Sequence, residues 1–274
     1  MTANGNGNRH ENSWDHSTHE DFFDYYANES RSEATLQRFR GIQAAVLRIA
    51  ERTEMMGQLD VADIGCGAGT QALLWAERGH RVFGLDVNGP LISLARQRTQ
   101  DKGLLVRFEV GTATALPWDD ESMNVCLLPE LLEHVADWRS CLNEAARVLR
   151  PGGLLYLSTT NVLCPRQQEF NLPLYSWYPA PLKRYCERLA VTTRPALASY
   201  ATYPAVNWFS FYSLRGFLQP LGFRCLDRFD LIDTAGKSRL AQFIVTMLRR
   251  SSLLGFLGHV ATPTTYLVAV KSAS

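Results

Sequence analysis

The stretch Val61-Ala62-Asp63-Ile64-Gly65-Cys66-Gly67-Ala68-Gly69 joins an apolar run to a segment with helical periodicity. Glycine lets the backbone adopt a positive φ and lie close to a ligand, and a helix that begins after the glycines presents free N–H groups. The stretch therefore predicts a strand, a glycine-rich turn and a helix. A nucleotide-type ligand is expected at the carboxyl end of the strand.

Short β-type runs alternate with helix-type runs on either side of this turn. The expected strands cover 59–64, 81–85, 105–110, 124–128, 153–158, 223–230 and 264–270. The expected helices cover 69–78, 90–102 and 138–149, with two more, 20–30 and 32–52, in front of the sheet. Because the strands are apolar along their length, they favour a parallel sheet with helices on both faces. The expected fold class is therefore α/β.

The composition is that of an ordinary globular protein, with 46% hydrophobic and 20% charged residues in a chain of 274. The 28 Lys and Arg residues nearly balance the 27 Asp and Glu residues, so the net charge of +1 gives no reason to expect a nucleic-acid partner. The six cysteines are far apart and form no CxxC pair. This spacing predicts reduced and mostly buried thiols rather than a zinc site or a disulfide framework.

Residues 1–15 contain too few apolar groups to offset the entropy of ordering, so we expect a disordered tail before a single domain, 16–274. The tail has no apolar h-region, and the most apolar later run, Leu240 to Val260, is interrupted by Arg249 and Arg250. We therefore expect no signal peptide, no membrane-spanning helix and a cytoplasmic location. The sequence does not indicate an oligomeric state.

Two acidic residues lie where a ligand of the glycine turn would be. Asp86 ends the second expected strand, 23 residues after Asp63, and can accept hydrogen bonds from both hydroxyls of a ribose. Asp63 comes just before the glycines, where its charge would repel a pyrophosphate but would suit a cationic amino group. A GxGxG pattern with a preceding acid thus indicates a ligand with an amino-acid moiety rather than a dinucleotide.

Four features together resemble the class I methyltransferases that use S-adenosylmethionine (SAM), over roughly residues 35–160. They are Asp63-Ile-Gly65-Cys-Gly67-Ala-Gly69, Asp86, Ala115-Leu116-Pro117-Trp118 and Leu132-Glu133-His134-Val135. The resemblance implies a Rossmann-like sheet of the seven expected strands in the order 3-2-1-4-5-7-6, with strand seven antiparallel, and SAM as the cofactor. The residues expected to bind it are Asp63, Gly65, Cys66, Gly67, Gly69, Asp86, Val87, Thr112, Ala113 and Pro129.

Two positions depart from the usual pattern of this family. Gly111-Thr112-Ala113 stands where members commonly have a Gly-Asp-Ala step, so Thr112 or a backbone group must replace an acidic contact to the adenine amino group. Asn124 stands where an acid often precedes strand four. Neither change alters the expected cofactor, which depends on Asp63, the glycines and Asp86.

The candidate catalytic residues lie in the segment from Pro129 to His134. Glu130, Glu133 and His134 are spaced at i, i+3 and i+4, which a helical turn would place on one face. His134, with an ordinary pKa of about 6.5, is the candidate base for an oxygen acceptor. The alternative is a pair at a helix start without a chemical role. The ExxEH arrangement also resembles ubiquinone-pathway O-methyltransferases, in which it is associated with a divalent metal, but a site without metal is favoured because Glu-His-Val is widespread in the superfamily.

Residues 161–222 interrupt the alternation with prolines and aromatic residues. A long irregular segment inside a compact domain is commonly a lid or binding loop, so we expect this insert between strands five and six to hold the acceptor. The insert and the apolar run 240–260 indicate a hydrophobic acceptor or contact with a membrane surface, and cations beside apolar residues in 174–189 fit an interfacial helix. Simple packing of the lid is the alternative.

The favoured reaction is O-methylation of a small hydrophobic, lipid-linked, quinone-like or glycan acceptor. The alternatives are N- or C-methylation of a small molecule and a SAM-binding protein without catalysis. Nucleic-acid methylation is disfavoured, because Leu128-Pro129-Glu130-Leu131 stands where an NPPY-type or (D/N)PPF-type tetrapeptide would follow strand four. A protein substrate stays open.

Overall fold

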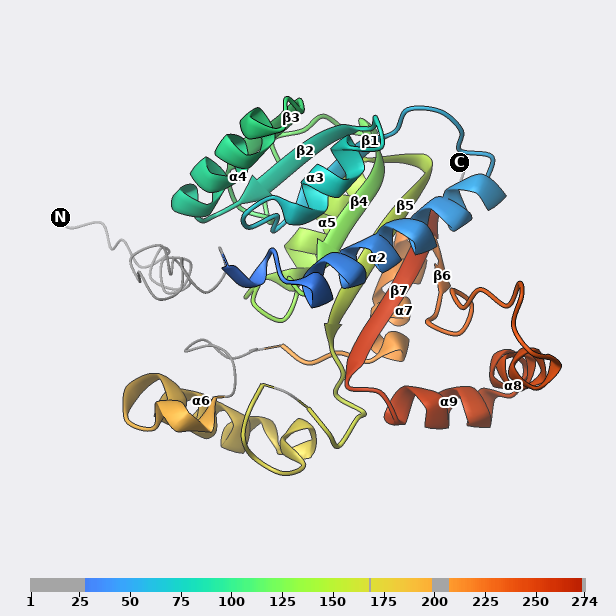
Figure 1. The fold of residues 1–274 in the computed structure, drawn as a ribbon. Helices are drawn as coiled ribbons and strands as arrows, with labels where there is room; N and C mark the ends of the chain where they lie inside the picture. The colour runs from blue at the N-terminus through green and yellow to red at the C-terminus, as the bar shows by residue number, and fades with distance from the viewer. Residues whose placement is uncertain (1–27, 168, 199–206, 273–274) are drawn as a thin grey trace. The chain divides into compact units, whose positions relative to one another are not determined.

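The computed structural model describes residues 28–167, 169–198 and 207–272. Its strands form a seven-stranded sheet in the order β3-β2-β1-β4-β5-β7-β6 (Figure 1). β1 is parallel to β2 and to β4, β2 is parallel to β3, and β7 is antiparallel to β6. The expected strand order and the antiparallel seventh strand are confirmed. Two compact units divide the chain, the first with 28–128 and 135–155, the second with 129–134 and 156–272.

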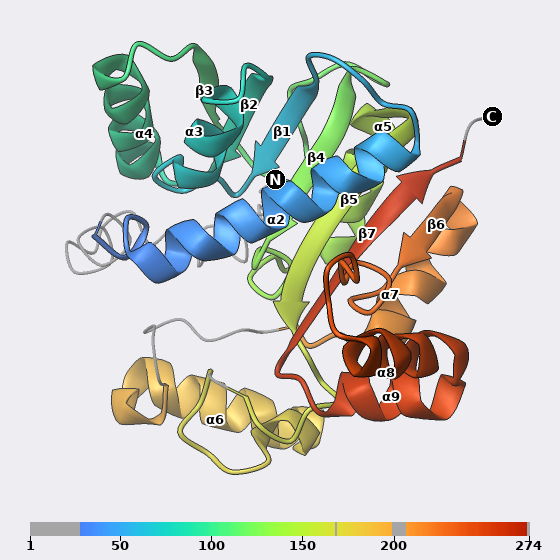
Figure 2. The same cartoon turned by 45° about the vertical axis from the view of Figure 1, so that its right-hand side comes forward.

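The first unit holds the parallel part of the sheet. Its strands are β1 (Asp60–Ile64), β2 (Arg81–Asp86), β3 (Val106–Val110) and β4 (Met123–Pro129), and its helices are α2 (Glu33–Arg52), α3 (Thr70–Ala76), α4 (Gly89–Asp101) and α5 (Trp138–Val148). α3 packs on β1 and β2, and α4 packs on β2 and β3. α2 and α3 lie on one face of these strands and α5 lies on the other (Figures 1 and 2). All of β1 is buried as a result, which explains its unbroken apolar run.

The ends of these elements agree with the expected ranges to within two residues. β5 (Leu149–Thr160) differs, because it begins four residues before the expected start and includes Pro151-Gly152-Gly153. The tail 1–15 lies outside the described residues, and so does most of the expected helix 20–30. All six cysteines are free, and all but Cys225 are buried, as expected.

In its described residues, the second unit holds the rest of β5, β6 (Phe223–Leu226), β7 (Thr264–Lys271) and four helices. The helices are α6 (Ala180–Thr192), α7 (Phe211–Leu218), α8 (Arg239–Arg250) and α9 (Ser252–Val260), with short 3₁₀ turns at Tyr175–Trp177, Pro195–Leu197 and Gln219–Leu221. α7 packs on β6 and β7. The sixth strand is shorter than expected, because the Asp227 carboxylate accepts hydrogen bonds from the Phe229 and Asp230 amides and turns the chain.

The insert 161–222 is more regular than its prolines and aromatic residues suggest. Its described part contains α6 and α7, and α6 has a small core of its own. That core consists of Phe170, Tyr175, Cys186 and Ala190, with the rings of Phe170 and Tyr175 stacked 4.1 Å apart. The insert therefore carries a local packed cluster rather than a purely irregular loop.

No single described helix is long and apolar enough to cross a membrane. α8 and α9 pass the same test of length and composition only when taken together, and they are bent by 102° at their junction.

Candidate functional site

The glycine loop joins β1 to α3 in the first unit, as the sequence predicts. The amides of Gly65 and Cys66 both donate to the Leu85 carbonyl, at 2.8 and 3.0 Å, so the loop is fixed to the end of β2. Gly65, Gly67 and Gly69 all have positive φ. The side chain of Cys66 is buried, and burial raises the pKa of its thiol well above the ordinary value, so the thiol stays protonated at neutral pH.

Gly67 and Gly69 need glycine for different reasons. A Cβ on Gly69 would lie 2.8 Å from the Ala95 Cβ and 2.9 Å from the ring of Phe108, so Gly69 lets α3, α4 and β3 pack closely. A Cβ on Gly67 would meet nothing within 4 Å. Gly67 therefore borders open space, and this is where a ligand can approach the backbone.

Asp86 organises the loop from the end of β2. Its Oδ2 accepts a hydrogen bond from the Gly67 amide at 2.8 Å, and its Oδ1 accepts one from the Asn88 amide at 2.9 Å. Burial raises the pKa of Asp86, although the amides of Asn88, Gly67 and Val87 oppose the shift. A carboxylate has about four acceptor sites in all, so Asp86 is a suitable residue type to accept hydrogen bonds from a pair of ribose hydroxyls as well.

Asp63 is a fully buried carboxyl at the base of the loop. Neither oxygen has a hydrogen-bond partner in the described part of the chain. Burial raises the pKa of Asp63 to about 7. The Ala72 amide lowers this pKa, although it is not placed to form a hydrogen bond with the carboxyl, and the negative charge of Asp86 raises it further. A buried carboxyl without a donor is costly, so a cationic or hydrogen-bonding ligand is the natural partner.

Two further residues at this loop were not found from the sequence. Gln71, in the first turn of α3, is buried, and its amide oxygen and nitrogen both lack a partner among the described residues. Arg98 donates to the Ala68 carbonyl at 3.1 Å and to the Ser30 hydroxyl at 3.0 Å, and so ties the loop to the chain before α2. A Gln and an Arg at ordinary helix positions give no signal in a single sequence.

The other expected cofactor residues lie at strand ends. Val87, directly after β2, is an apolar side chain with 54% of its surface exposed. Ala113 is buried, whereas Thr112 is exposed and its hydroxyl lies 2.8 Å from that of Thr114. Pro129 ends β4. Val87 thus offers an apolar surface beside Asp86, of the kind that an adenine ring covers.

The segment after β4 belongs to the second unit and is not helical, so the expectation of one helical face is wrong. Glu130 has φ 52°, and the next helix begins only at Trp138, with Asp137 as its N-cap. The His134 amide donates to the Leu131 carbonyl, which closes a turn. Glu130 is exposed and Glu133 is buried, so the two carboxyls do not share a face.

Burial shifts the pKa values of Glu133 and His134 in opposite directions. It raises the pKa of Glu133 to about 8, and the charges of Glu130 and Glu169 add to the rise. It lowers the pKa of His134 to about 4, against the attraction of Glu130. At neutral pH, Glu133 therefore holds its proton and His134 is an uncharged imidazole that can accept one.

Asn207, in the insert, holds this segment in place. Its side-chain amide donates to the Leu132 carbonyl at 3.0 Å, and its backbone amide donates to the Glu133 carbonyl at 3.2 Å. On the other side, the Glu130 amide donates to the Ser158 carbonyl at 2.9 Å. Asn207 lies 75 residues from Leu132 in sequence, so a single sequence could not identify it.

Within the described ranges, no group of three His, Cys, Asp or Glu side chains is placed to hold a metal ion. Glu130, Glu133 and His134 are thus not arranged as a three-ligand metal site in this structure.

Comparison with known sequences identifies the central part of the chain. Residues 62–157 match the family described as "Methyltransferase domain". A ubiquinone biosynthesis O-methyltransferase of Sinorhizobium medicae (strain WSM419) is 33% identical over 135 residues, and the match covers 46% of this chain and 54% of that protein. The chain thus spans about half the length of the curated relative.

Comparison with solved structures extends over most of the chain. Magnesium protoporphyrin IX methyltransferase from Synechocystis PCC 6803, solved with bound S-adenosylhomocysteine, has a TM-score of 0.56 at 16% identity and covers 92% of this chain and 95% of its own. The [4+2]-cyclase SpnF has a TM-score of 0.53 at 20% identity, with 91% and 86% covered. These likenesses show a shared fold, and a fold that also serves a cyclase does not fix the reaction.

Proposed function

We propose that this chain, whose residues 62–157 match the family described as "Methyltransferase domain", is a SAM-dependent methyltransferase that transfers the methyl group of SAM to an oxygen of a small hydrophobic, lipid-linked or glycan acceptor. The observation that carries the proposal is the buried Asp63 carboxyl, without a partner among the described residues, at the base of a glycine loop that borders open space. The cytoplasmic location expected from the sequence stays a prediction.

The residues of the first unit fit the chemical parts of SAM. Asp63 suits the ammonium of its methionine half, with Gln71 as a further polar partner. Asp86 suits the ribose hydroxyls, and Val87 suits the adenine ring. When bound, SAM supplies an electrophilic methyl group on a sulfonium. The glycine loop and these side chains bind and orient it.

The segment after β4 carries the groups proposed to act on the acceptor. Methyl transfer is an in-line displacement, so the main tasks of the chain are to position the acceptor and to exclude water. An acceptor hydroxyl must also lose a proton, and the neutral imidazole of His134 can accept it. Glu133 is protonated at neutral pH, so it adds no buried negative charge near His134. Glu130 is exposed to solvent.

Transfer of label from SAM is the test of the proposed function. The chain is incubated with SAM that carries an isotopically labelled methyl group and with lipid and small-molecule extracts, and mass spectrometry identifies labelled products. A label on oxygen supports the proposal. A label on nitrogen or carbon supports the alternative methyltransferase, and SAM binding without any product supports a SAM-binding protein without catalysis.

Asp86→Ala is expected to weaken SAM binding by about 10- to 200-fold and to remove labelled product at low SAM. The variant loses its charged hydrogen bonds to the ribose, at a total cost of roughly 1.5–3 kcal/mol. It also leaves the Gly67 and Asn88 amides without their acceptor, which loosens the glycine loop and weakens SAM binding further. Titration calorimetry measures the affinity. Asp101→Ala, which removes an exposed carboxylate at the end of α4, is the control, and equal SAM affinity in both variants would refute the assignment.

We further propose that the insert shapes the acceptor site, because Asn207 fixes the backbone of Leu132 and Glu133. α6 has only a small core, so it is expected to open locally at low free-energy cost. Hydrogen exchange of Ala180–Thr192 should slow when acceptor and S-adenosylhomocysteine are added, while that of β1 stays unchanged. Strong and equal protection of α6 in both states would instead indicate a rigid structural subdomain.

A further inference from the structure

The geometry points to α8 and α9 as a docking surface for an anionic lipid bilayer. This inference is independent of the proposed methyl transfer. It concerns the segment between β6 and β7, which the proposed cofactor and acceptor sites do not use.

α8 turns its apolar face outward. Leu240, Phe243, Ile244 and Met247 follow the i, i+3, i+4, i+7 spacing of one helix face, and all four are exposed, Leu240 by 69% and Phe243 by 62%. In a helix of an ordinary globular protein such a stripe faces the core. Here the only buried residue of the helix is Val245, outside the stripe. The apolar face of α8 therefore lacks a partner within the described chain.

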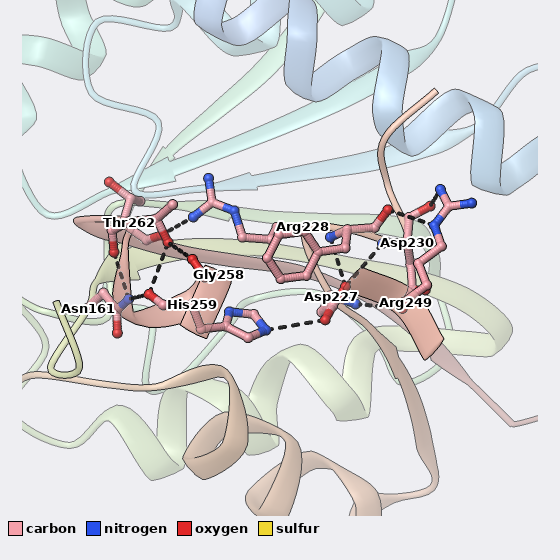
Figure 3. Close-up of polar contacts among 10 residues, drawn as sticks. Asn161, Asp227, Arg228, Asp230, Arg249, Gly258, His259 and Thr262 are labelled. Carbon is pink, nitrogen blue, oxygen red and sulfur yellow. Dashed lines mark hydrogen bonds and ion pairs between the residues drawn. The ribbon is translucent and has the colours of Figure 1, made fainter. Parts of the chain in front are cut away.

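The opposite side of α8 is attached to the protein by polar contacts (Figure 3). The Arg249 guanidinium donates to the carbonyls of Phe229, Asp230 and Ile232, at 3.0, 3.3 and 2.8 Å. Arg249 lies half a helical turn from the apolar stripe, which fixes the stripe on the outer side. The outward orientation is thus built into the structure rather than left to a loose helix.

α9 shows the same arrangement at the bend. Leu253, Leu254, Phe256 and Leu257 are exposed, with Leu253 exposed by 66%, whereas Gly255 and His259 are buried. The His259 Nε2 lies 3.2 Å from the Asp227 carboxylate (Figure 3). The His259 ring also stacks on the Phe211 ring, with their centroids 5.2 Å apart. A Cβ on Gly258 would lie 2.4 Å from the Phe229 ring, so this glycine lets α9 lie close to the chain beneath it. Both helices thus present apolar side chains from a fixed base.

The charge of this segment selects an anionic partner. Between Thr234 and Pro263 the sequence has no Asp or Glu, and it has four cations, Lys237, Arg239, Arg249 and Arg250. Arg249 is held by backbone carbonyls, so Lys237, Arg239 and Arg250 are the cations left to meet an anionic partner. Cations beside an outward apolar face are the features of a helix that lies in the interface of an anionic membrane. A second copy of this chain fits less well, because a two-fold interface would bring two identical cationic surfaces together.

Vesicle flotation tests the inference with the full-length chain. Vesicles of phosphatidylcholine with roughly a third phosphatidylglycerol should bind the chain, vesicles of phosphatidylcholine alone should bind it much less, and salt should weaken binding. Phe243→Ser/Leu253→Ser should lower the affinity on the order of a hundredfold, because two large side chains no longer enter the bilayer. Arg239→Gln/Arg250→Gln should lower it on the order of thirtyfold.

Two matched controls keep the test specific. Arg52→Gln/Arg78→Gln removes two exposed cations elsewhere, and Leu105→Ser removes an exposed leucine from the start of the β3 edge; both should bind as the natural chain does. Unchanged thermal unfolding shows that the exposed substitutions leave the fold intact. Equal binding to both vesicle types overturns the inference. So does a dimer in sedimentation that Phe243→Ser/Leu253→Ser dissociates, and so does a loss of binding confined to an α6 variant such as Leu182→Ser.

Discussion

Asp63→Asn is expected to make the free protein more stable and at the same time to weaken its affinity for SAM. The carboxyl is fully buried and has no hydrogen-bond partner in the described residues, so its charged form is costly in the free protein. Asparagine has nearly the same size and cannot ionise. The same carboxyl is the group proposed to hold the SAM ammonium, so the gain in stability and the loss of affinity have one physical cause.

The stabilisation depends on pH in a defined direction. The pKa of Asp63 rises from 3.8 to about 7 on folding, so the folded chain keeps a proton that the unfolded chain has lost. The resulting penalty is absent below pH 4, grows between pH 4 and 7, and is complete above that range. With about 1.4 kcal/mol per pKa unit, the gain from Asp63→Asn should reach on the order of 2–4 kcal/mol near pH 8 and vanish near pH 4.

Urea unfolding at several pH values and SAM titration of the same samples check both parts. The affinity for SAM should fall by about 10- to 100-fold, since a charged hydrogen bond is lost. Asp101→Asn changes an exposed carboxylate and should alter neither quantity. A stabilised variant with natural SAM affinity would mean that Asp63 does not face the cofactor. A destabilised variant would mean that the carboxyl has a partner in the folded chain.

The first unit could be predicted because its elements depend on local patterns. β1 is buried throughout and reads as an apolar run, the loop needs glycine at Gly67 and Gly69, and α4 begins at the Asn88 cap before a proline. Asp63 and Asp86 could be predicted from the sequence for the same reason, because the end of a strand places each of them. Local spacing and strand ends are enough for this kind of site.

The site residues of the second unit are placed by long-range contacts, and for them the local structure predicted from the sequence was wrong. The i, i+3, i+4 spacing of Glu130, Glu133 and His134 predicted a helix. The chain instead turns at Glu130, and the next helix begins only after its N-cap, Asp137. The segment is held instead by Asn207, which comes from a distant part of the chain. Opposite pKa shifts at Glu133 and His134 follow from burial, which spacing does not encode.

His134→Ala is expected to lower the rate of methyl transfer by about 10²-fold, at the lower end of the 10²–10⁴ range typical of a general base. A base with a pKa near 4 is almost entirely unprotonated at neutral pH, but it is a weak base, so the driving force for proton transfer to it is small. The expected loss of rate is therefore at the lower end of the range. The affinity for SAM should not change. This separates loss of proton transfer from loss of cofactor, and single-turnover rates together with SAM titration measure the two quantities.

The pH profile provides a readout that a purely structural histidine would not move. His134 accepts a proton only in its neutral form, so at saturating SAM the activity of the natural chain should fall as the pH drops through about 4, rather than through the ordinary histidine value of about 6.5. His134→Ala should lose that acid limb, and His134→Gln, which keeps a polar side chain without the base, should behave like alanine. Natural turnover in His134→Ala would return the residue to a structural role at the turn. An acid limb that persists in the variant would assign the proton to another group.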